Sequence, residues 1–294
     1  MSSAVVTSTL APLYGSPDHR AEVTSEALLG HLLAVLEERG PFVRVRGEDE
    51  HAAWVHRGHL LLGSEPLAAA WREEAQATSL GAVLSVDGRT RLLLPLGARL
   101  VLERDGSVRL PDGRGAQQAR RRIAAAATLQ DESRAMAPAP WAEIFFAGAP
   151  YRWGGVTPWG VDCSGLVQAT FRVRGIRLPR DSAQQAQAGE ALAATAAAGE
   201  FAPGDLLCFG EPSVEGEAKP ARRRLVGGAA GPRITHVAIA DGAGYVVHAS
   251  AAAGGVCRSP LAGGSAEAAW LRETFRAARR VERAVGAGPS GRRG

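Results

Sequence analysis

Cysteine is scarce in this sequence, which has only three, Cys163, Cys208 and Cys257, among 294 residues. An odd and sparse set of cysteines argues against a disulfide framework and is typical of a reducing compartment. No apolar run reaches membrane-spanning length, and residues 1–20 lack the basic and apolar regions of a signal peptide. We therefore expect a cytoplasmic protein with no membrane partner.

Lysine is almost absent, because Lys219 is the only lysine among 34 basic residues, and aromatic residues make up only 5% of the chain. The net charge is +4, and no alternating pattern of arginine and aromatic residues accompanies it. We therefore expect no nucleic-acid partner. A hydrophobic content of 46%, a charged content of 22% and the length of 294 residues predict a globular protein of two or three domains.

The most informative stretch surrounds Cys163 and runs over residues 151–171, YRWGGVTPWGVDCSGLVQATF. A run of Gly, Pro and Trp precedes the cysteine, and apolar residues recur at helical spacing after it, so a helix is expected to begin at Asp162 or Cys163. The positive end of a helix favours a thiolate and lowers the pKa of a cysteine there. We interpret Cys163 as a covalent nucleophile, although a lone cysteine is more often a small buried residue.

Two later histidines fit the base that such a nucleophile needs. Two alternating, β-branched runs flank the turn-forming residues 241–244, and each run carries one histidine, which predicts a β-hairpin. If the turn centres on Gly242, His236 lies directly opposite His248. His248 would then fix the tautomer of His236 and leave its other nitrogen for Cys163. A slip of one residue in the register would separate the two rings.

These motifs resemble those of the NlpC-type cell-wall cysteine peptidases, a family with a papain-like fold. The matching segments, in the family's order, are Y-R-W-G-G, D-C-S-G-L-V, L-P-R-D-S, P-G-D-L-L, T-H-V-A-I and V-V-H-A-S. The resemblance covers about residues 140–282 and implies an α+β catalytic domain. It further implies a hydrolase, a thiol protease that cuts murein (peptidoglycan) stem peptides between γ-D-glutamate and the following L-diamino acid.

The resemblance also assigns roles to individual residues. Cys163, His236 and His248 are the expected catalytic residues. Tyr151 matches a tyrosine that lies near the thiol in the family, so it is an expected oxyanion or positioning donor, with a packed core tyrosine as the open alternative. The remaining substrate-binding positions are Trp153, Asp162, Ser164, Arg180, Asp181 and Ser182. A purely structural pairing of Asp181 with Arg180 also stays open.

The N-terminal part reads as short strands with turns between them, as in small β-barrels. Its pattern A-P-L-Y-G-S-P, S-E-A-L-L-G, V-L-E-E-x-G-x-F-V-R-V-R resembles a bacterial SH3 domain. We predict one SH3-like barrel over residues 1–68 and a divergent second one with a linker over 69–137, where 115–137 is expected to be helical. The catalytic domain follows over 138–285, and a disordered tail over 286–294.

Individual elements can also be predicted. The strands expected in the first two domains cover residues 4–9, 32–38, 42–46, 54–55, 80–86, 91–94, 99–104 and 108–110. In the catalytic domain we expect a helix over 141–147 and a strand within 201–209 that carries Cys208 as a core thiol. Residues 211–233 are expected to form a surface loop, and 265–285 a helix or a closing strand.

The domain order resembles that of cytoplasmic γ-D-glutamyl-L-diamino acid endopeptidases of murein-peptide recycling. In such enzymes the first SH3 domain closes one end of the cleft and favours short peptides with a free N-terminal L-Ala. The family tends to have Gly-Glu where this chain has Gly30 and His31, so the acidic partner of the substrate ammonium is undetermined. The candidates for this role are Glu26, Glu48, Asp49 and Glu50.

Two other function classes stay open at this point. One is a non-catalytic peptidoglycan-binding protein, and the other is a thiol acyltransferase on the same fold. The histidines outside the hairpin form no ligand pattern with the cysteines, so we expect no metal and no other cofactor, and no effect of chelators on activity. We expect murein-derived peptides as the binding partners of a monomer.

Overall fold

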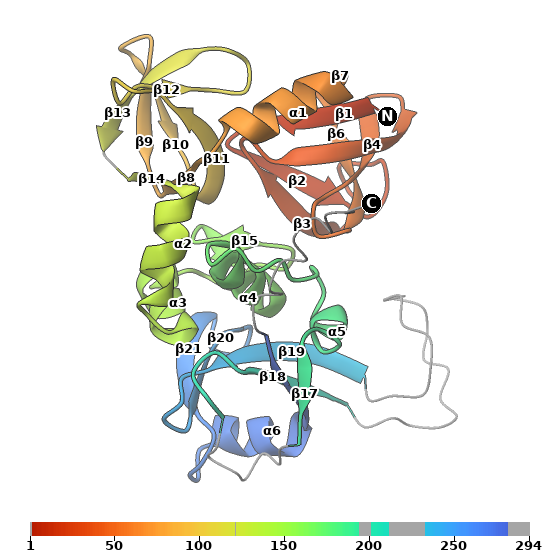
Figure 1. Ribbon diagram of the computed structural model, residues 1–294. Helices are drawn as coiled ribbons and strands as arrows, with labels where there is room; N and C mark the ends of the chain where they lie inside the picture. The colour runs from red at the N-terminus through yellow and green to blue at the C-terminus, as the bar shows by residue number, and fades with distance from the viewer. Residues whose placement is uncertain (1, 121, 194–200, 212–232, 282–294) are drawn as a thin grey trace, which may run out of the picture.

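The computed structural model describes residues 2–120, 122–193, 201–211 and 233–281. Two seven-stranded sheets form the N-terminal part, and a six-stranded sheet with helices on both faces forms the C-terminal part. The two N-terminal sheets lie beside one another above the C-terminal part, and helices α2 and α3 run between them and it (Figure 1). Within the described ranges, no helix combines the length and apolarity needed to cross a membrane.

The first sheet has the strand order β3-β2-β6-β5-β4-β1-β7, and all its pairings are antiparallel. Its elements are β1 (Ser2–Val6), β2 (Leu10–Tyr14), β3 (Val23–Leu28), β4 (Leu32–Arg39), β5 (Phe42–Arg46), β6 (Ala52–His56), η1 (Arg57–His59), β7 (Leu60–Ser64) and α1 (Glu65–Glu74). The strands predicted over 32–38, 42–46 and 54–55 are confirmed. The strand predicted over 4–9 is wrong in its bounds, because β1 ends at Val6 and a bend follows.

The second sheet has the strand order β10-β9-β13-β12-β11-β8-β14. Its strands are β8 (Ala77–Leu80), β9 (Val83–Val86), β10 (Thr90–Leu93), β11 (Leu96–Leu102), β12 (Val108–Arg109), β13 (Gly115–Arg120) and β14 (Ile123–Ala125). The helix predicted over 115–137 is wrong in its first half, since α2 (Ala126–Arg134) begins only after β14. Ala and Arg are good helix formers, but intrinsic propensity is a weak signal beside tertiary context, and pairing of β13 with β9 and β12 overrides it. Barrel closure and the domain boundaries stay predictions.

The C-terminal sheet has the strand order β17-β22-β18-β19-β20-β21. The elements of this part are α3 (Pro138–Phe146), β15 (Val156–Thr157), β16 (Gly160–Val161), α4 (Cys163–Arg172), α5 (Ser182–Gln185), β17 (Glu190–Leu192), β18 (Leu206–Glu211), β19 (Arg233–Ala240), β20 (Tyr245–Ser250), β21 (Gly255–Pro260), α6 (Ala266–Thr274) and β22 (Phe275–Arg280). The helix predicted over 141–147 starts earlier, at Pro138, because a proline is tolerated in the first helical turn. The segment 265–285 contains both a helix and a strand. Residues 212–232 of the predicted loop and the tail 286–294 lie outside the described residues.

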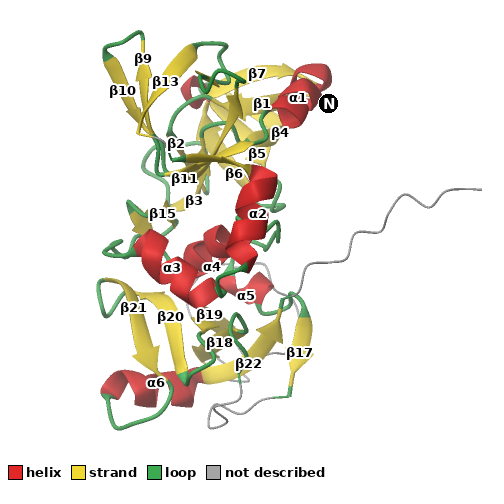
Figure 2. Cartoon of the chain, turned by 60° about the vertical axis from the view of Figure 1, so that its left-hand side comes forward, coloured by secondary structure: helices red, strands yellow, loops and turns green. Residues whose placement is uncertain are grey.

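Helices cover the two faces of this sheet, with α3 and α4 on one face and α6 on the other (Figure 2). Side chains of β18 alternate accordingly. Leu206 and Cys208 join the core cluster that includes α4, whereas Leu207 and Phe209 join the cluster that includes Leu271 of α6. Cys208 is therefore a core thiol, as predicted. Helix α4 lies between this sheet and the N-terminal part (Figure 1).

Candidate active site

Cys163 is the first residue of α4, and the residue before it caps the helix. Asp162 Oδ1 accepts a hydrogen bond of 2.7 Å from the N–H of Gly165, and Oδ2 accepts one of 2.9 Å from the N–H of Gly154. A Cβ on Gly165 would lie 2.1 Å from the carbonyl oxygen of Gly155, so only glycine fits at this position. The predicted placement of Cys163 at the start of a helix is confirmed, and its side chain is only 5% exposed.

A buried ion pair supports this helix start. Arg180 donates to both carboxylate oxygens of Asp162, at 3.0 and 2.6 Å, and also to Ser164 Oγ at 2.8 Å. Its Nε donates to Ser25 Oγ, on β3 of the first sheet, at 3.0 Å. Asp162 and Arg180 are 2% and 1% exposed. These buried side chains bind one another, the helix and the first sheet, and substrate binding by Asp162, Ser164 and Arg180 stays a prediction.

The two histidines of the hairpin are in contact. His236 Nε2 and His248 Nδ1 are 2.7 Å apart, so the predicted bond between the rings is present. The predicted register is wrong by two residues, because Ile239 pairs with Val247 and the position opposite His248 is therefore Ala238. A shift by two residues keeps both histidines on one face of the sheet, and diagonal neighbours there are within reach of long side chains.

Asp241 accounts for the shifted register. Its carboxylate accepts hydrogen bonds from the N–H groups of Ala243, at 2.7 Å, and Tyr245, at 3.1 Å. The N–H of Asp241 also donates to the carbonyl of Tyr245 at 3.0 Å. The turn therefore closes between Asp241 and Tyr245 and centres on Ala243, so each residue of the first strand pairs two residues further along the second strand than a turn centred on Gly242 predicts.

Three further polar side chains surround the other nitrogen of His248, and the sequence interpretation missed them. Ser259 Oγ lies 3.0 Å from Nε2, while Cys257 Sγ and Glu267 Oε1 each lie 3.4 Å from it. Since an ionised carboxylate can only accept, Glu267 favours the tautomer of His248 that carries its proton on Nε2. Nδ1 of His248 is then an acceptor, so it can accept a hydrogen bond from Nε2–H of His236.

The helix that carries the thiol packs against the strands that carry these two histidines. Helix α4 packs on β19, and the N–H of Val237 approaches Cys163 closely enough to lower the pKa of the thiol. Within the described part of the chain, no hydrogen bond joins Cys163 Sγ to the ring of His236, so the predicted direct contact is absent in this state. Phe209 and Trp270 flank that ring, with centroids 5.8 and 5.6 Å away.

Burial sets the resting protonation of both groups. It raises the pKa of the Cys163 thiol to about 12, and the Asp162 carboxylate adds to this increase. Burial also lowers the pKa of His236 to about 3, with His248 as a second cause. The predicted low thiol pKa is therefore wrong for this state, because burial outweighs the N–H groups of Val237 and Ser164. Each shift penalises a single buried charge, whereas a thiolate and an imidazolium formed together stabilise one another.

Comparisons with known proteins identify the family of the chain. The sequence pattern of the NlpC/P60 family matches residues 148–276, and that of the bacterial dipeptidyl-peptidase Sh3 domain matches residues 13–60. The probable endopeptidase NlpC of Escherichia coli is 36% identical over 135 residues, which cover 46% of this chain and 70% of the relative. The chain belongs to the NlpC/P60 family. The matched domain is that of a cysteine peptidase, as predicted.

Two other NlpC/P60 relatives carry a more specific name. The γ-D-glutamyl-L-lysine dipeptidyl-peptidase of Bacillus subtilis is 32% identical over 131 residues, which cover 45% of this chain but only 34% of the relative. Its Bacillus cereus namesake is 25% identical over 259 residues, covering 82% of this chain and 71% of the relative. A solved NlpC/P60 structure from Bacillus cereus shares the fold, with a TM-score of 0.70 at 20% identity over 95% of this chain and 99% of that one.

The other predicted site residues range from buried to exposed. The ring of Tyr151 packs against the core cluster that contains Cys163. Trp153 is 41% exposed and donates from Nε1 to Glu22 Oε1 at 2.6 Å. Asp181 is half-buried, and Ser182 is the buried first residue of α5. Substrate binding by Tyr151, Trp153, Asp181 and Ser182 stays a prediction.

Three of the four acidic candidates for the substrate ammonium have basic partners: Glu26, Glu48 and Glu50. Glu26 is buried, forms an ion pair with Arg152 and accepts from the N–H of Val156 at 3.1 Å, so it joins β3 to the catalytic part. Glu50 is exposed and lies 3.4 Å from Arg46 on its own sheet. Neither carboxylate is available without breaking these contacts.

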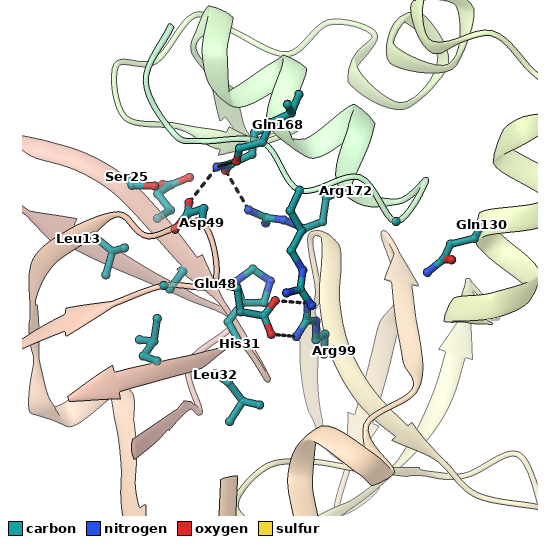
Figure 3. Close-up of a pocket in the computed structure, with 17 residues that line it drawn as sticks. Leu13, Ser25, His31, Leu32, Glu48, Asp49, Arg99, Gln130, Gln168 and Arg172 are labelled. Atoms are coloured by element: carbon teal, nitrogen blue, oxygen red, sulfur yellow. Dashed lines mark hydrogen bonds and ion pairs between the residues drawn. The ribbon is translucent and has the colours of Figure 1, made fainter. Parts of the chain in front are cut away.

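Glu48 and Asp49 line a cavity of about 190 Å³ between the first sheet, β11 and α4 (Figure 3). Arg99 binds both oxygens of Glu48, at 2.9 and 2.7 Å. Gln168 of α4 donates to Asp49 Oδ2 at 2.8 Å and accepts from Arg172 at 2.9 Å. These contacts fasten the three parts of the protein together.

His31, which stands where the resemblance led us to expect a glutamate, also lies at this junction. Its Nδ1 accepts from the N–H of Leu28, and its Nε2 lies 3.3 Å from the carbonyl oxygen of Gly97 in the second sheet. Burial, with Arg172 and Arg99, holds the pKa of His31 well below its usual range. His31 therefore joins the two N-terminal sheets as a neutral side chain.

Proposed function

We propose that this protein is a cysteine endopeptidase that hydrolyses the γ-D-glutamyl-L-diamino acid bond of murein stem peptides. The preferred substrates are short, free peptides with an N-terminal L-Ala. The observation that carries this proposal is the 2.7 Å bond between His236 and His248, on strands against which the helix of Cys163 packs. Membership of the NlpC/P60 family and the names of the two Bacillus relatives support the substrate class.

Acylation begins as Cys163 Sγ attacks the γ-carbonyl carbon of D-glutamate. The thiol proton passes to Nδ1 of His236, and Nε2–H of His236 donates to Nδ1 of His248, so the imidazolium is stabilised as it forms. The side chain of Cys163 turns from the backbone of Val237 toward the ring for this step, since catalytic hydrogen bonds are often incomplete before substrate binds. The negative charge on the carbonyl oxygen is held by the N–H of Cys163, and Tyr151 is the second proposed donor.

Collapse of this intermediate breaks the C–N bond, and the leaving amine takes the proton from His236. The peptide that begins with the diamino acid leaves, and the thioester of Cys163 remains. Water then gives a proton to His236 while its oxygen attacks the thioester carbonyl. The C–S bond breaks, the thiolate takes back the proton, and L-Ala-γ-D-Glu is released.

Contacts between the first sheet and the catalytic part support the preference for short peptides. Ser25 binds Arg180, Glu22 binds Trp153, and Glu26 forms an ion pair with Arg152, so β3 and its preceding loop lie against the segment that leads to Cys163. Closure of the cleft at this place would leave room for only two substrate residues, L-Ala and D-Glu, on the N-terminal side of the scissile bond. Asp181 is the proposed partner of the ammonium, because it is half-buried and its charge acts on His51 of the first sheet.

The fold proposed with this function has a papain-like catalytic domain behind two SH3-like barrels. The packing of the nucleophile's helix on the histidine-bearing strands supports the first part. The match of residues 13–60 to a bacterial dipeptidyl-peptidase Sh3 domain supports the first barrel. We also propose a monomeric, cytoplasmic protein in murein-peptide recycling, and finding it outside the cytoplasmic membrane on cell fractionation would overturn that location.

The test is incubation with L-Ala-γ-D-Glu-meso-diaminopimelate and with its L-Lys counterpart, followed by mass spectrometry of the products. Release of L-Ala-γ-D-Glu that disappears in Cys163→Ala supports the proposal, and N-acetylation of L-Ala should suppress it. Transfer to an added amine at a rate comparable with hydrolysis would favour an acyltransferase. Binding to sacculi without cleavage of any of these peptides would favour a wall-binding protein.

A further inference from the structure

We propose that His248, Cys257 and Glu267 form an inhibitory site for Zn²⁺ on the side of His248 that faces away from His236. The three residues come from β20, β21 and the first turn of α6. Cys257 pairs directly with His248 across the two strands, so both side chains lie on one face of the sheet. Their donor atoms and a carboxylate oxygen of Glu267 all lie within 4.8 Å of one another.

The distances between these atoms match one face of a tetrahedron around zinc. Usual bond lengths of zinc to nitrogen, oxygen and sulfur require separations of about 3.3 Å for nitrogen to oxygen and about 3.5 Å for the two pairs that include sulfur. The structure has 3.4 Å between His248 Nε2 and Glu267 Oε1, 3.4 Å between Nε2 and Cys257 Sγ, and 3.9 Å between Sγ and Oε1. A shift of a few tenths of an ångström by Glu267, whose side chain is 39% exposed, completes the fit.

The donor set selects the class of metal. One thiolate, one imidazole and one carboxylate suit zinc far better than magnesium or calcium, which prefer oxygen ligands alone. Binding releases the proton of the Cys257 thiol to solvent, so the thiolate and the carboxylate together balance the charge of Zn²⁺. Cys257 is half-buried and Glu267 is partly exposed, so the ion reaches the site from solvent and a water molecule takes the fourth position.

Zinc at this site would reverse a hydrogen bond of the proposed mechanism. The ion occupies the lone pair of His248 Nε2, so the neutral ring must carry its proton on Nδ1. Nδ1–H then points at Nε2 of His236, where catalysis requires an acceptor. His236 can no longer donate to His248 through Nε2, and the imidazolium that receives the thiol proton loses its partner. The inhibition, though not the binding, rests on the proposed function.

Binding is tested in a Cys163→Ala background, which removes the catalytic thiol as a competing ligand. Isothermal titration with ZnCl₂ should give one site per chain. Adding Cys257→Ser should weaken zinc binding at least tenfold, and adding Glu267→Gln should also weaken it. Glu273→Gln, an exposed glutamate on the same helix, is the matched control and should leave binding unchanged. Equal zinc affinity with and without Cys257 would overturn the site, whatever the protein's activity.

Inhibition is tested on proteins that retain Cys163, each compared with its own rate in the absence of zinc. Zinc should inhibit the unmodified protein, and Cys257→Ser should raise the concentration for half-inhibition at least tenfold. Equal inhibition of both proteins would show that zinc acts elsewhere than at Cys257, for example at the Cys163 thiol, and would overturn the inhibitory role. If the peptide is not cleaved at all, the proposed function fails, while the titration still decides the binding site.

Discussion

Removing either partner of the Asp162–Arg180 ion pair should destabilise the protein, and the two substitutions should differ in size. In Arg180→Met, the carboxylate of Asp162 keeps the N–H groups of Gly154 and Gly165 and the hydroxyl of Ser164. In Asp162→Asn, the guanidinium loses the carboxylate that pairs with it and keeps only neutral acceptors, which are the hydroxyl oxygens of Ser25 and Ser164 and the one amide oxygen of the substituted side chain. The asparagine variant therefore leaves the less compensated charge.

These partners set the expected magnitudes. A buried charge that loses its counter-charge costs about 3–5 kcal/mol, which is the loss expected for Asp162→Asn. Arg180→Met should lower the free energy of unfolding by about 1–3 kcal/mol, because the carboxylate of Asp162 loses the hydrogen bonds from Arg180 but keeps its others. The double variant should cost less than the two single variants together, with a coupling of about 1–3 kcal/mol.

Urea unfolding followed by tryptophan fluorescence and circular dichroism measures these free energies. Arg134→Met is the matched control, because it breaks an exposed pair with Asp131 and should cost less than about 1 kcal/mol. Equal losses for Asp162→Asn and Arg180→Met, or additive losses in the double variant, would refute the reasoning. Either result would mean that the pair does not act as a buried unit at the helix start.

Three further predictions follow from particular contacts. His31 is neutral in the folded protein but gains a proton in the unfolded chain as the pH falls through about 6.5, so stability is complete above that value and is lost below it. Between pH 7 and pH 5, the free energy of unfolding should fall by about 1–2 kcal/mol less in His31→Gln than in the unmodified protein. Urea midpoints that fall in parallel with pH in the two proteins would contradict this. Gly165→Ala should lower the free energy of unfolding and should lower the rate of peptide cleavage more than tenfold, because its Cβ would lie 2.1 Å from Gly155 O. Gly264→Ala, which has open space around it, should change neither quantity. A chelator should not lower the cleavage rate, since no step passes through a metal, and loss of activity that zinc restores would disprove it.

Local signals in the sequence were sufficient for the parts of the site that depend on neighbours in the chain. Asp162 caps the helix of Cys163 by reaching an N–H three residues on, so the position of the helix start could be predicted. The hairpin could also be predicted from neighbouring residues, because turn-forming residues separate two runs of alternating apolar residues. Its register was not predicted, since the carboxylate of Asp241 selects a different turn closure.

Features that depend on distant parts of the chain could not be predicted. The partners of His248 come from a neighbouring strand and a later helix, and only the pairing of β20 with β21 brings Cys257 opposite it. Strand β13 was predicted as a helix because its own residues are helix formers, and its pairing with β9 and β12 cannot be read from those residues. The raised pKa of Cys163 likewise depends on burial by surrounding elements, which outweighs the local effect of the helix start.

The central claim, that the sulfur of Cys163 carries out the cleavage, is tested most directly by partial alkylation. Iodoacetamide-treated samples are divided between peptide mapping, which gives the alkylated fraction of Cys163 separately from that of Cys257, and the release of L-Ala-γ-D-Glu from L-Ala-γ-D-Glu-meso-diaminopimelate. The account predicts that the remaining activity equals the unalkylated fraction of Cys163 at every time point. Undiminished release of the dipeptide from protein fully alkylated at Cys163 would contradict it.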